Sequence, residues 1–219
     1  HGGESTQGVI DESIRHSITK MSHLHFVATS TYEKRVIQLG ESPKYVFNVG
    51  GLGIDNINKL RLLTKHNLQE FMDFEFGLKN LIITFHPVTL EKNSSRNQVE
   101  ELLDALDSFL DINYIFTMPN SDTDGRVIMK MIEDFCKNRK NAKCYKSLGQ
   151  INYLSCLKYV DGVVGNSSSG LIEAPSFKKG TINIGNRQKG RLKAKSVIDC
   201  AAEKSEIVSA IKKLYSAEF

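Results

Sequence analysis

Hydrophobic and polar positions alternate along this chain in two different rhythms. Short, nearly continuous hydrophobic runs are separated by longer stretches in which hydrophobic residues recur every three or four positions. The first kind is typical of strands covered on both faces, and the second of amphipathic helices. Their alternation predicts an α/β fold with a parallel sheet. The expected strands span residues 24–29, 45–49, 81–85, 113–118, 143–146, 162–164 and 181–184, and the clearest helices span 97–110, 126–138 and 201–215.

A cluster of glycines marks a candidate domain boundary after the second expected strand. Gly50, Gly51 and Gly53 suit a hinge or an ordinary turn, because glycine takes positive φ freely. Residues 1–50 hold only two expected strands and cannot close a substantial core, so we expect them to be the remnant of a preceding domain. Residues 51–219 suffice for one doubly wound domain. The opening HGGESTQG has neither an initiator Met nor the regions of a signal peptide, so we expect a chain cut from a longer protein.

Composition narrows the class of ligand. The chain is 40% hydrophobic and 25% charged, as in ordinary globular proteins, and its net charge of +4 is spread along the chain. A nucleic-acid binder usually shows a clustered basic face, so a small anionic ligand is the better match. No hydrophobic run approaches the ~20 residues of a membrane helix, so neither a membrane nor nucleic acid is an expected partner. The four cysteines lie far apart without a C-x-x-C pair, which argues against a metal site or disulfide framework and favours the cytoplasm.

Small, polar or titratable residues follow four of the expected strands. They are HPVT at 86–89, PNSD at 119–122, GNSSSG at 165–170 and GNRQKGR at 185–191. The carboxyl ends of parallel strands lie at one edge of the sheet, where open α/β sheets bind their ligands. The four strand ends together therefore predict a site.

The strongest of these segments is GNSSSGLIEAP at residues 165–175. Serine hydroxyls and free N–H groups at a helix start can hold a phosphate, and the carboxylate of Glu173 would accept ribose hydroxyls. The alternative is ordinary serine capping of a helix, with Glu173 as a favourable acid in its first turns. Neither G-x-x-x-x-G-K-S/T nor G-x-G-x-x-G occurs, so ordinary NTPases and dinucleotide-binding enzymes lose support.

Other candidates carry charge. Arg187 is the first of three cations in a glycine-bracketed loop, which could neutralise a diphosphate or simply face solvent. His86 could donate to a phosphate, shuttle a proton or cap its strand. Near the start of the chain, the carboxylates Glu4 and Asp11 could divide acid and base work, or belong to a charged helix turn.

Five motifs, HGGESTQGVIDESIRHSITKMSHLHFVAT, TFHPVT, MPNSD, GNSSSGLIEAPSF and NIGNRQKGR, span nearly the whole chain in this order. Together they resemble the UDP-N-acetylglucosamine 2-epimerases, specifically the hydrolysing branch of sialic-acid and related nonulosonic-acid biosynthesis. The resemblance implies a GT-B-type fold, in which two Rossmann-like domains hold a nucleotide sugar between them. The chain would then be the C-terminal UDP-binding domain plus a remnant of the N-terminal domain. Such a piece is expected to be inactive alone, and the whole protein to form a homo-oligomer through the rest of the N-terminal domain.

The resemblance also implies contacts with the nucleotide. Ser167 and Ser168 would hold the diphosphate, and Glu173 would hold the ribose hydroxyls. The backbone at Ser147 and Leu148 would hold the edge of the uracil ring.

Further roles follow from the same resemblance. His86 would touch the diphosphate and assist the departure of UDP, while Asn120 and Arg187 would contact the nucleotide portion. Asp11 matches a catalytic carboxylate. Glu4 is the expected replacement acid, because the first residue of the chain is a histidine where some relatives have a catalytic glutamate. No metal or cofactor is implied.

The implied activity is hydrolysing 2-epimerisation of UDP-N-acetylglucosamine. A base removes the proton at C2 while UDP leaves from C1, and water then adds to the glycal intermediate, giving UDP and a free sugar such as N-acetylmannosamine. Three alternatives remain: the same reaction on a UDP-2,4-diacetamido-trideoxy sugar, a UDP-dependent glycosyltransferase of the same fold, and a non-catalytic UDP-sugar sensor.

Overall fold

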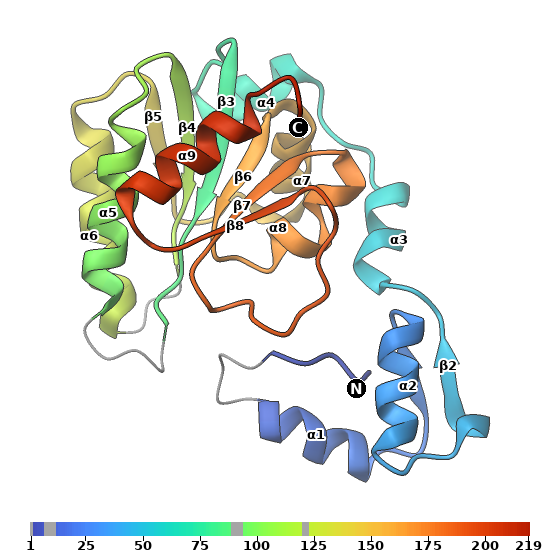
Figure 1. Cartoon of the computed structure of the whole chain (residues 1–219). Helices are drawn as coiled ribbons and strands as arrows, with labels where there is room; N and C mark the ends of the chain where they lie inside the picture. Colours follow the sequence, from blue (N-terminus) through green and yellow to red (C-terminus); the bar gives the residue numbers. More distant parts are fainter. Residues whose placement is uncertain (1, 7–11, 89–93, 120–122) are drawn as a thin grey trace. The chain divides into compact units, whose positions relative to one another are not determined.

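The computed structural model describes residues 2–6, 12–88, 94–119 and 123–219 (Figure 1). By the contacts between its residues, the chain divides into two compact units. The first unit comprises His1–Leu60 and Arg187–Arg191, and the second comprises Arg61–Asn186 and Leu192–Phe219. The assignment of residues 1–50 and 51–219 to two domains of a longer protein stays a prediction.

In the described residues, the second unit is built on a six-stranded parallel sheet of order β5-β4-β3-β6-β7-β8. The chain runs outward from β3 to β5, returns to pair β6 with β3, and then continues to β8 on the other side. The order therefore reverses between β3 and β6, and such a switch point is where doubly wound sheets bind ligands. The strands are β3 (Lys79–Thr84), β4 (Ile112–Thr117), β5 (Ala142–Tyr145), β6 (Gly162–Gly165), β7 (Gly180–Ile184) and β8 (Val197–Cys200).

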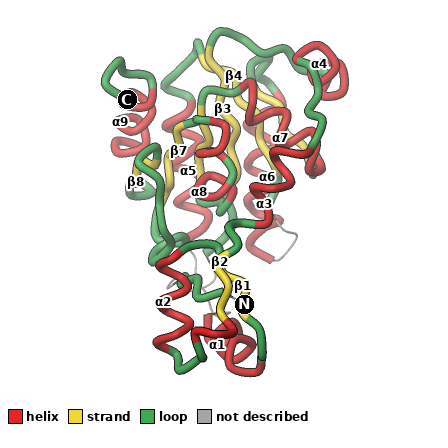
Figure 2. Tube along the Cα trace, turned by 90° about the vertical axis from the view of Figure 1, so that its right-hand side faces the viewer, coloured by secondary structure: helices red, strands yellow, loops and turns green. Residues whose placement is uncertain are grey.

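Helices cover both faces of this sheet. On one face α5 (Ser94–Leu106), α6 (Thr123–Lys137) and α9 (Lys204–Leu214) pack against the strands and each other. The other face carries α7 (Gly149–Tyr159), the single turn α8 (Ser169–Ile172) and the 3₁₀ turn η2 (Ala174–Phe177), with α4 (Lys65–Met72) packed on α7. Figure 2 shows α4 and α7 on one side of the strands and α9 on the other. Double coverage explains why the central strands are almost wholly apolar.

The core of the second unit lies between the sheet and the α5, α6 and α9 layer. Leu81, Ile83 and Phe116 are fully buried there. The hydroxyl of Tyr114 is also buried and donates to the carbonyl of Leu106 at 2.7 Å, so its polar atom is satisfied.

The seven expected strands and three expected helices are confirmed, with bounds that differ by a few residues. Several further elements were not expected, and two of them show why. β8 was missed because only Ile198 among its four residues is buried, which leaves no strand pattern. α7 was missed because its residues 154–157 are buried in succession, and a helix buried on several sides loses its periodicity.

The first unit is small. It contains α1 (Glu12–Met21), α2 (Ser30–Gln38), α3 (Leu52–Lys59) and the 3₁₀ turn η1 (Pro43–Tyr45), with a parallel pair of strands, β1 (His25–Val27) and β2 (Val46–Asn48). The cluster of buried hydrophobic residues found in its described part consists of Val27, Tyr32, Val36 and Val46. The expectation that this segment cannot form a substantial core alone stays a prediction. No helix in the described residues is long and apolar enough to cross a membrane.

Candidate functional site

A cavity of about 440 Å³ lies at the carboxyl edge of the second unit's sheet. It is lined by the ends of β3 and β4, by the segment that leads from β5 into α7, and by Ser167 and Glu173 beyond β6. All of its lining residues belong to the second unit. The volume falls within the ~300–1,000 Å³ of typical small-ligand pockets, and the place is where a doubly wound sheet binds its ligand.

The switch point beside this cavity is shaped by Gly165 and Asn166. Gly165 has a φ of +131°, and a Cβ there would lie 2.0 Å from the carbonyl oxygen of Thr84, so only glycine fits. The side chain of Asn166 is fully buried and holds the backbone of His86 at both ends. Its Oδ1 accepts from the His86 N–H at 2.7 Å, and its Nδ2 donates to the His86 carbonyl at 2.8 Å. Together these residues fix the end of β3 against the end of β6.

The segment after Asn166 turns sharply rather than starting a long helix. α8 has one turn, Ser169–Ile172, and Glu173 follows it directly. The 3₁₀ turn η2 then begins at Ala174. Within the described residues the side chain of Ser168 makes no capping hydrogen bond, but the Ser167 hydroxyl accepts from the N–H of Ser169 at 3.4 Å, so serine capping of this turn stays an alternative to ligand binding. The Ser167 and Ser168 hydroxyls are groups of this segment that can donate a hydrogen bond to an anion.

Four of the sequence-predicted site residues meet in the cavity: Ser147, Leu148, Ser167 and Glu173 line it together. They come from two segments about 20 residues apart in sequence that β6 and α7 bring to one edge. His86 is half-buried and held by Asn166 but is not among the lining residues.

The remaining predicted site residues are Arg187, Glu4, Ser168, Asn120 and Asp11. Arg187 belongs to the first unit by its contacts, and so does Glu4. Ser168 is half-buried next to the lining residue Ser167. Asn120 and Asp11 lie outside the described residues.

Several lining residues were not predicted. Thr84 and Thr117 end adjacent strands, and their hydroxyls are hydrogen-bonded to each other. Tyr153 of α7 lines the same cavity. Among the lining residues, Lys146 at the end of β5 is the one cation. The rule that ligands bind at strand ends was not applied to β5. Applied there, it would have found Lys146. Tyr153 lies on a helix whose pattern gave no signal.

A second polar cluster lies within the first unit. The carboxylate of Glu4 lies 3.5 Å from Arg15 and 3.7 Å from Arg191, and Arg191 Nε donates to the Thr6 hydroxyl at 3.1 Å. Burial raises the pKa of Glu12, but the Thr6 N–H, at 2.8 Å, and nearby cations outweigh it and hold that pKa below its usual value. Glu4 and Thr6 are therefore held by Arg15 and Arg191, and Arg191 acts there rather than as a free surface cation.

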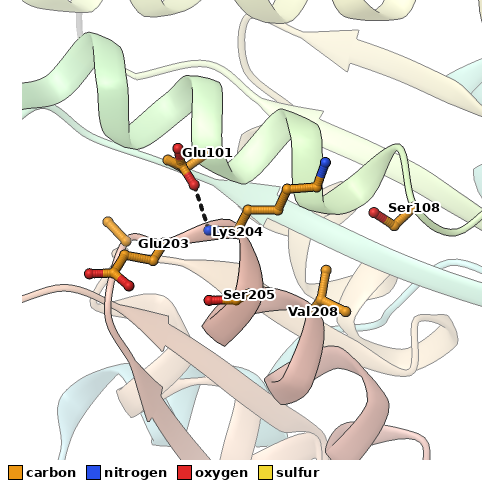
Figure 3. A pocket seen from close by; sticks show the side chains of 7 residues that line it. Glu101, Ser108, Glu203, Lys204, Ser205 and Val208 are labelled. Atoms are coloured by element: carbon orange, nitrogen blue, oxygen red, sulfur yellow. Dashed lines mark hydrogen bonds between the residues drawn. The ribbon is translucent and has the colours of Figure 1, made fainter.

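The larger cleft between α5 and α9 is a poor match for a phosphate. It measures about 840 Å³, and Figure 3 shows Glu101 beside Lys204, whose backbone N–H donates to the Glu101 carboxylate at 2.6 Å. Glu203 adds a second carboxylate. Two carboxylates repel an anionic ligand, so the cavity at the strand edge is the candidate site. Among the described residues, no group of three or more His, Cys, Asp or Glu side chains could hold a metal ion.

A ligand cavity at the switch point of a parallel sheet defines the class: a Rossmann-like α/β protein whose site lies at the strand ends. Comparison with known proteins names the family. The family model described as UDP-N-acetylglucosamine 2-epimerase matches residues 1–219, and the chain belongs to this family.

Curated relatives agree with this membership. The chain is 43% identical over 219 residues, all of its length and 56% of the relative's, to the GDP/UDP-N,N'-diacetylbacillosamine 2-epimerase (hydrolyzing) of Campylobacter jejuni. It is 47% identical over 213 residues to the polysialic acid biosynthesis protein P7 of Escherichia coli, covering 96% of this chain and 54% of that protein. The chain thus spans about half the length of the curated relatives it matches.

Solved structures share the fold. The UDP-GlcNAc 2-epimerase of Methanocaldococcus jannaschii in complex with UDP-GlcNAc and UDP matches with a TM-score of 0.74 at 17% identity, over 100% of this chain and 63% of that one. The S. aureus MnaA–UDP structure matches with a TM-score of 0.73 at 15% identity, over 95% and 55%. The expected α/β fold of GT-B type, with a Rossmann-like parallel sheet flanked by helices, is confirmed.

Proposed function

We propose that the whole protein containing this chain is a hydrolysing UDP-sugar 2-epimerase, and that the cavity at the strand edge holds UDP. The observation that carries the proposal is the meeting of Ser147, Leu148, Ser167 and Glu173 in one cavity at the switch point of the sheet. Family membership and relatives that are named as hydrolysing 2-epimerases support it.

The chemistry of the lining residues fits the parts of UDP. The Ser167 hydroxyl and the neighbouring Ser168 are suited to the diphosphate, because hydroxyl and N–H donors stabilise phosphate oxygens. A carboxylate at Glu173 would be repelled by phosphate but accepts hydrogen bonds from ribose hydroxyls. The backbone at Ser147 and Leu148 offers both donors and acceptors for the edge of uracil.

Departure of UDP is the step that the site assists. A base takes the C2 proton, the bond from C1 to the diphosphate oxygen breaks, and negative charge grows on that oxygen. Preorganised donors at this position lower the barrier, because they need no reorganisation as the charge develops. We assign this role to His86, together with Asn120 and Arg187, and we keep Asp11 and Glu4 as the candidate catalytic carboxylates.

The sugar is the open part of the proposal. Two relatives, at 43% and 36% identity, are named for N,N'-diacetylbacillosamine, and one at 32% is named for UDP-N-acetylglucosamine. We therefore propose a UDP-2-acetamido sugar and treat the substituent at C4, hydroxyl or acetamido, as the quantity to be measured. We also propose a cytoplasmic enzyme, since all four cysteines are free thiols, and a homo-oligomer of the whole protein.

The test is turnover of the whole protein in D₂O with each of the two UDP-sugars. The proposal predicts release of UDP and a free 2-epimeric sugar that carries deuterium at C2, because the intermediate takes its new C2 proton from solvent. UDP release that needs an acceptor molecule, with the original hydrogen kept at C2, would identify a glycosyltransferase. Binding of UDP without release from either sugar would identify a sensor. Glu203→Gln, in the cleft between α5 and α9, is the control and is expected to keep full activity.

A further inference from the structure

Tyr153 joins two sides of the candidate UDP cavity. The residue lies on α7 and lines the cavity, while its hydroxyl lies 2.6 Å from the hydroxyl of Ser169, the first residue of α8. This is a side-chain hydrogen bond between two elements that are otherwise separated by β6 in the chain. A hydrogen bond of this length, with its phenol largely removed from solvent, restricts both side chains.

Ser169 in turn lies between two residues that the proposed function places at UDP. Its backbone N–H donates to the Ser167 hydroxyl at 3.4 Å, and its carbonyl accepts from the Glu173 N–H at 2.9 Å. Movement of Ser169 therefore shifts both the expected diphosphate contact and the expected ribose contact. Tyr153 is the side chain from outside this segment that holds Ser169 in place.

The phenol keeps its proton under ordinary conditions. Burial raises the pKa of Tyr153 far above its usual value, and the negative charge of Glu173 adds to that rise in spite of the Ser169 hydrogen bond. The hydroxyl thus stays a neutral partner for Ser169. Its removal would leave the Ser169 hydroxyl without that partner in a confined site, which costs more than an exposed hydrogen bond would.

We propose that Tyr153 is a positioning residue that, through Ser169, holds Ser167 and Glu173 in the arrangement that binds UDP. The inference rests on the proposed function in one respect, namely that this cavity binds UDP. It goes beyond that function because it gives Tyr153 a role in placing Ser167 and Glu173. The Tyr153 hydroxyl would fill this role through Ser169, without touching UDP itself.

A double-mutant cycle tests the proposal in the whole protein, with the Kd for UDP measured by calorimetry. Tyr153→Phe and Ser169→Ala are each expected to raise the Kd about 5- to 10-fold, the range of one net hydrogen bond. The double variant is expected to bind UDP no more weakly than the weaker-binding single variant, because both substitutions break the same Tyr153–Ser169 hydrogen bond. Tyr159→Phe is the matched control: the residue lies on the same helix, its hydroxyl donates to the Leu63 carbonyl at 3.0 Å, and it does not line the cavity. Its Kd should be unchanged.

The outcomes separate the two claims. Failure of the wild-type protein to bind UDP overturns the proposed function and this proposal with it. Binding by the wild type with an unchanged Kd in Tyr153→Phe overturns the positioning role alone. Effects of Tyr153→Phe and Ser169→Ala that multiply in the double variant also overturn it, because they would show two independent contributions. Should Ser169→Ala fail to fold, Ser169→Cys replaces it in the cycle with the same expected result.

Discussion

Replacement of Asn166 by alanine removes the clamp between the ends of β3 and β6. The wild-type side chain is fully buried and makes two hydrogen bonds to the backbone of His86, at 2.7 and 2.8 Å. Each such bond contributes about 0.5–1.5 kcal/mol net, and loss of a partner for a buried backbone group costs about 1–3 kcal/mol. His86 is half-buried, so water can replace part of what is lost. We therefore expect Asn166→Ala to lower the free energy of unfolding by about 2–4 kcal/mol.

The assay is urea unfolding followed by far-UV circular dichroism, since the chain contains no tryptophan. Asn166→Asp keeps an acceptor for the His86 N–H but places a carboxylate oxygen against the His86 carbonyl in a fully buried site, so the loss is expected to be at least as large as for alanine. Asn138→Ala, at an exposed position after α6, serves as the control and should change stability by less than about 0.5 kcal/mol. A free energy of unfolding for Asn166→Ala that equals that of the control would refute the role of this clamp.

Three further predictions concern the same structure. Gly165→Ala would place a Cβ 2.0 Å from the Thr84 carbonyl oxygen at a φ of +131°, so we expect the free energy of unfolding to fall by about 3 kcal/mol or more. A melting temperature close to that of the wild type would contradict this. The pKa of Glu12 is lowered in the folded chain, so its contribution to stability is present above the ordinary carboxyl value of 4.5 and is lost as the pH falls through the lower folded value. Thermal melts between pH 6 and pH 3 should therefore show a smaller pH dependence for Glu12→Gln than for the wild type, and equal dependence would disprove it. Arg191→Ala removes a cation that holds Glu4, so the whole protein should turn over about tenfold more slowly while its Kd for UDP is unchanged, and an equal change in both would count against this assignment.

The sequence predicts the sheet better than it predicts the site. Strands such as β3 and β7 are buried along nearly their whole length, so their apolar runs are visible without a structure. The edge strand β8 lacks this signal because only Ile198 among its four residues is buried. Likewise, Glu173 and Ser167 could be found because strand ends of a parallel sheet share one edge.

What the sequence could not predict is which side chains pair across long distances. Arg191 belongs to a cationic loop that suggested a diphosphate contact, yet it binds Thr6 and Glu4 at the other end of the chain. Tyr153 comes from a helix whose consecutive buried residues hide its periodicity, and its partner Ser169 is 16 residues away. Such pairs arise from tertiary packing, which residue spacing does not encode.

Hydrogen–deuterium exchange of the whole protein, with and without saturating UDP, tests the central claim most directly. If UDP lies in the cavity at the strand edge, the nucleotide should slow exchange in peptides covering residues 146–154 and 165–173. Peptides around Glu101 and Ser205, in the cleft between α5 and α9, should exchange at the same rate in both samples. Slowed exchange at that cleft with no change at residues 146–154 and 165–173 would contradict the assignment of the UDP site.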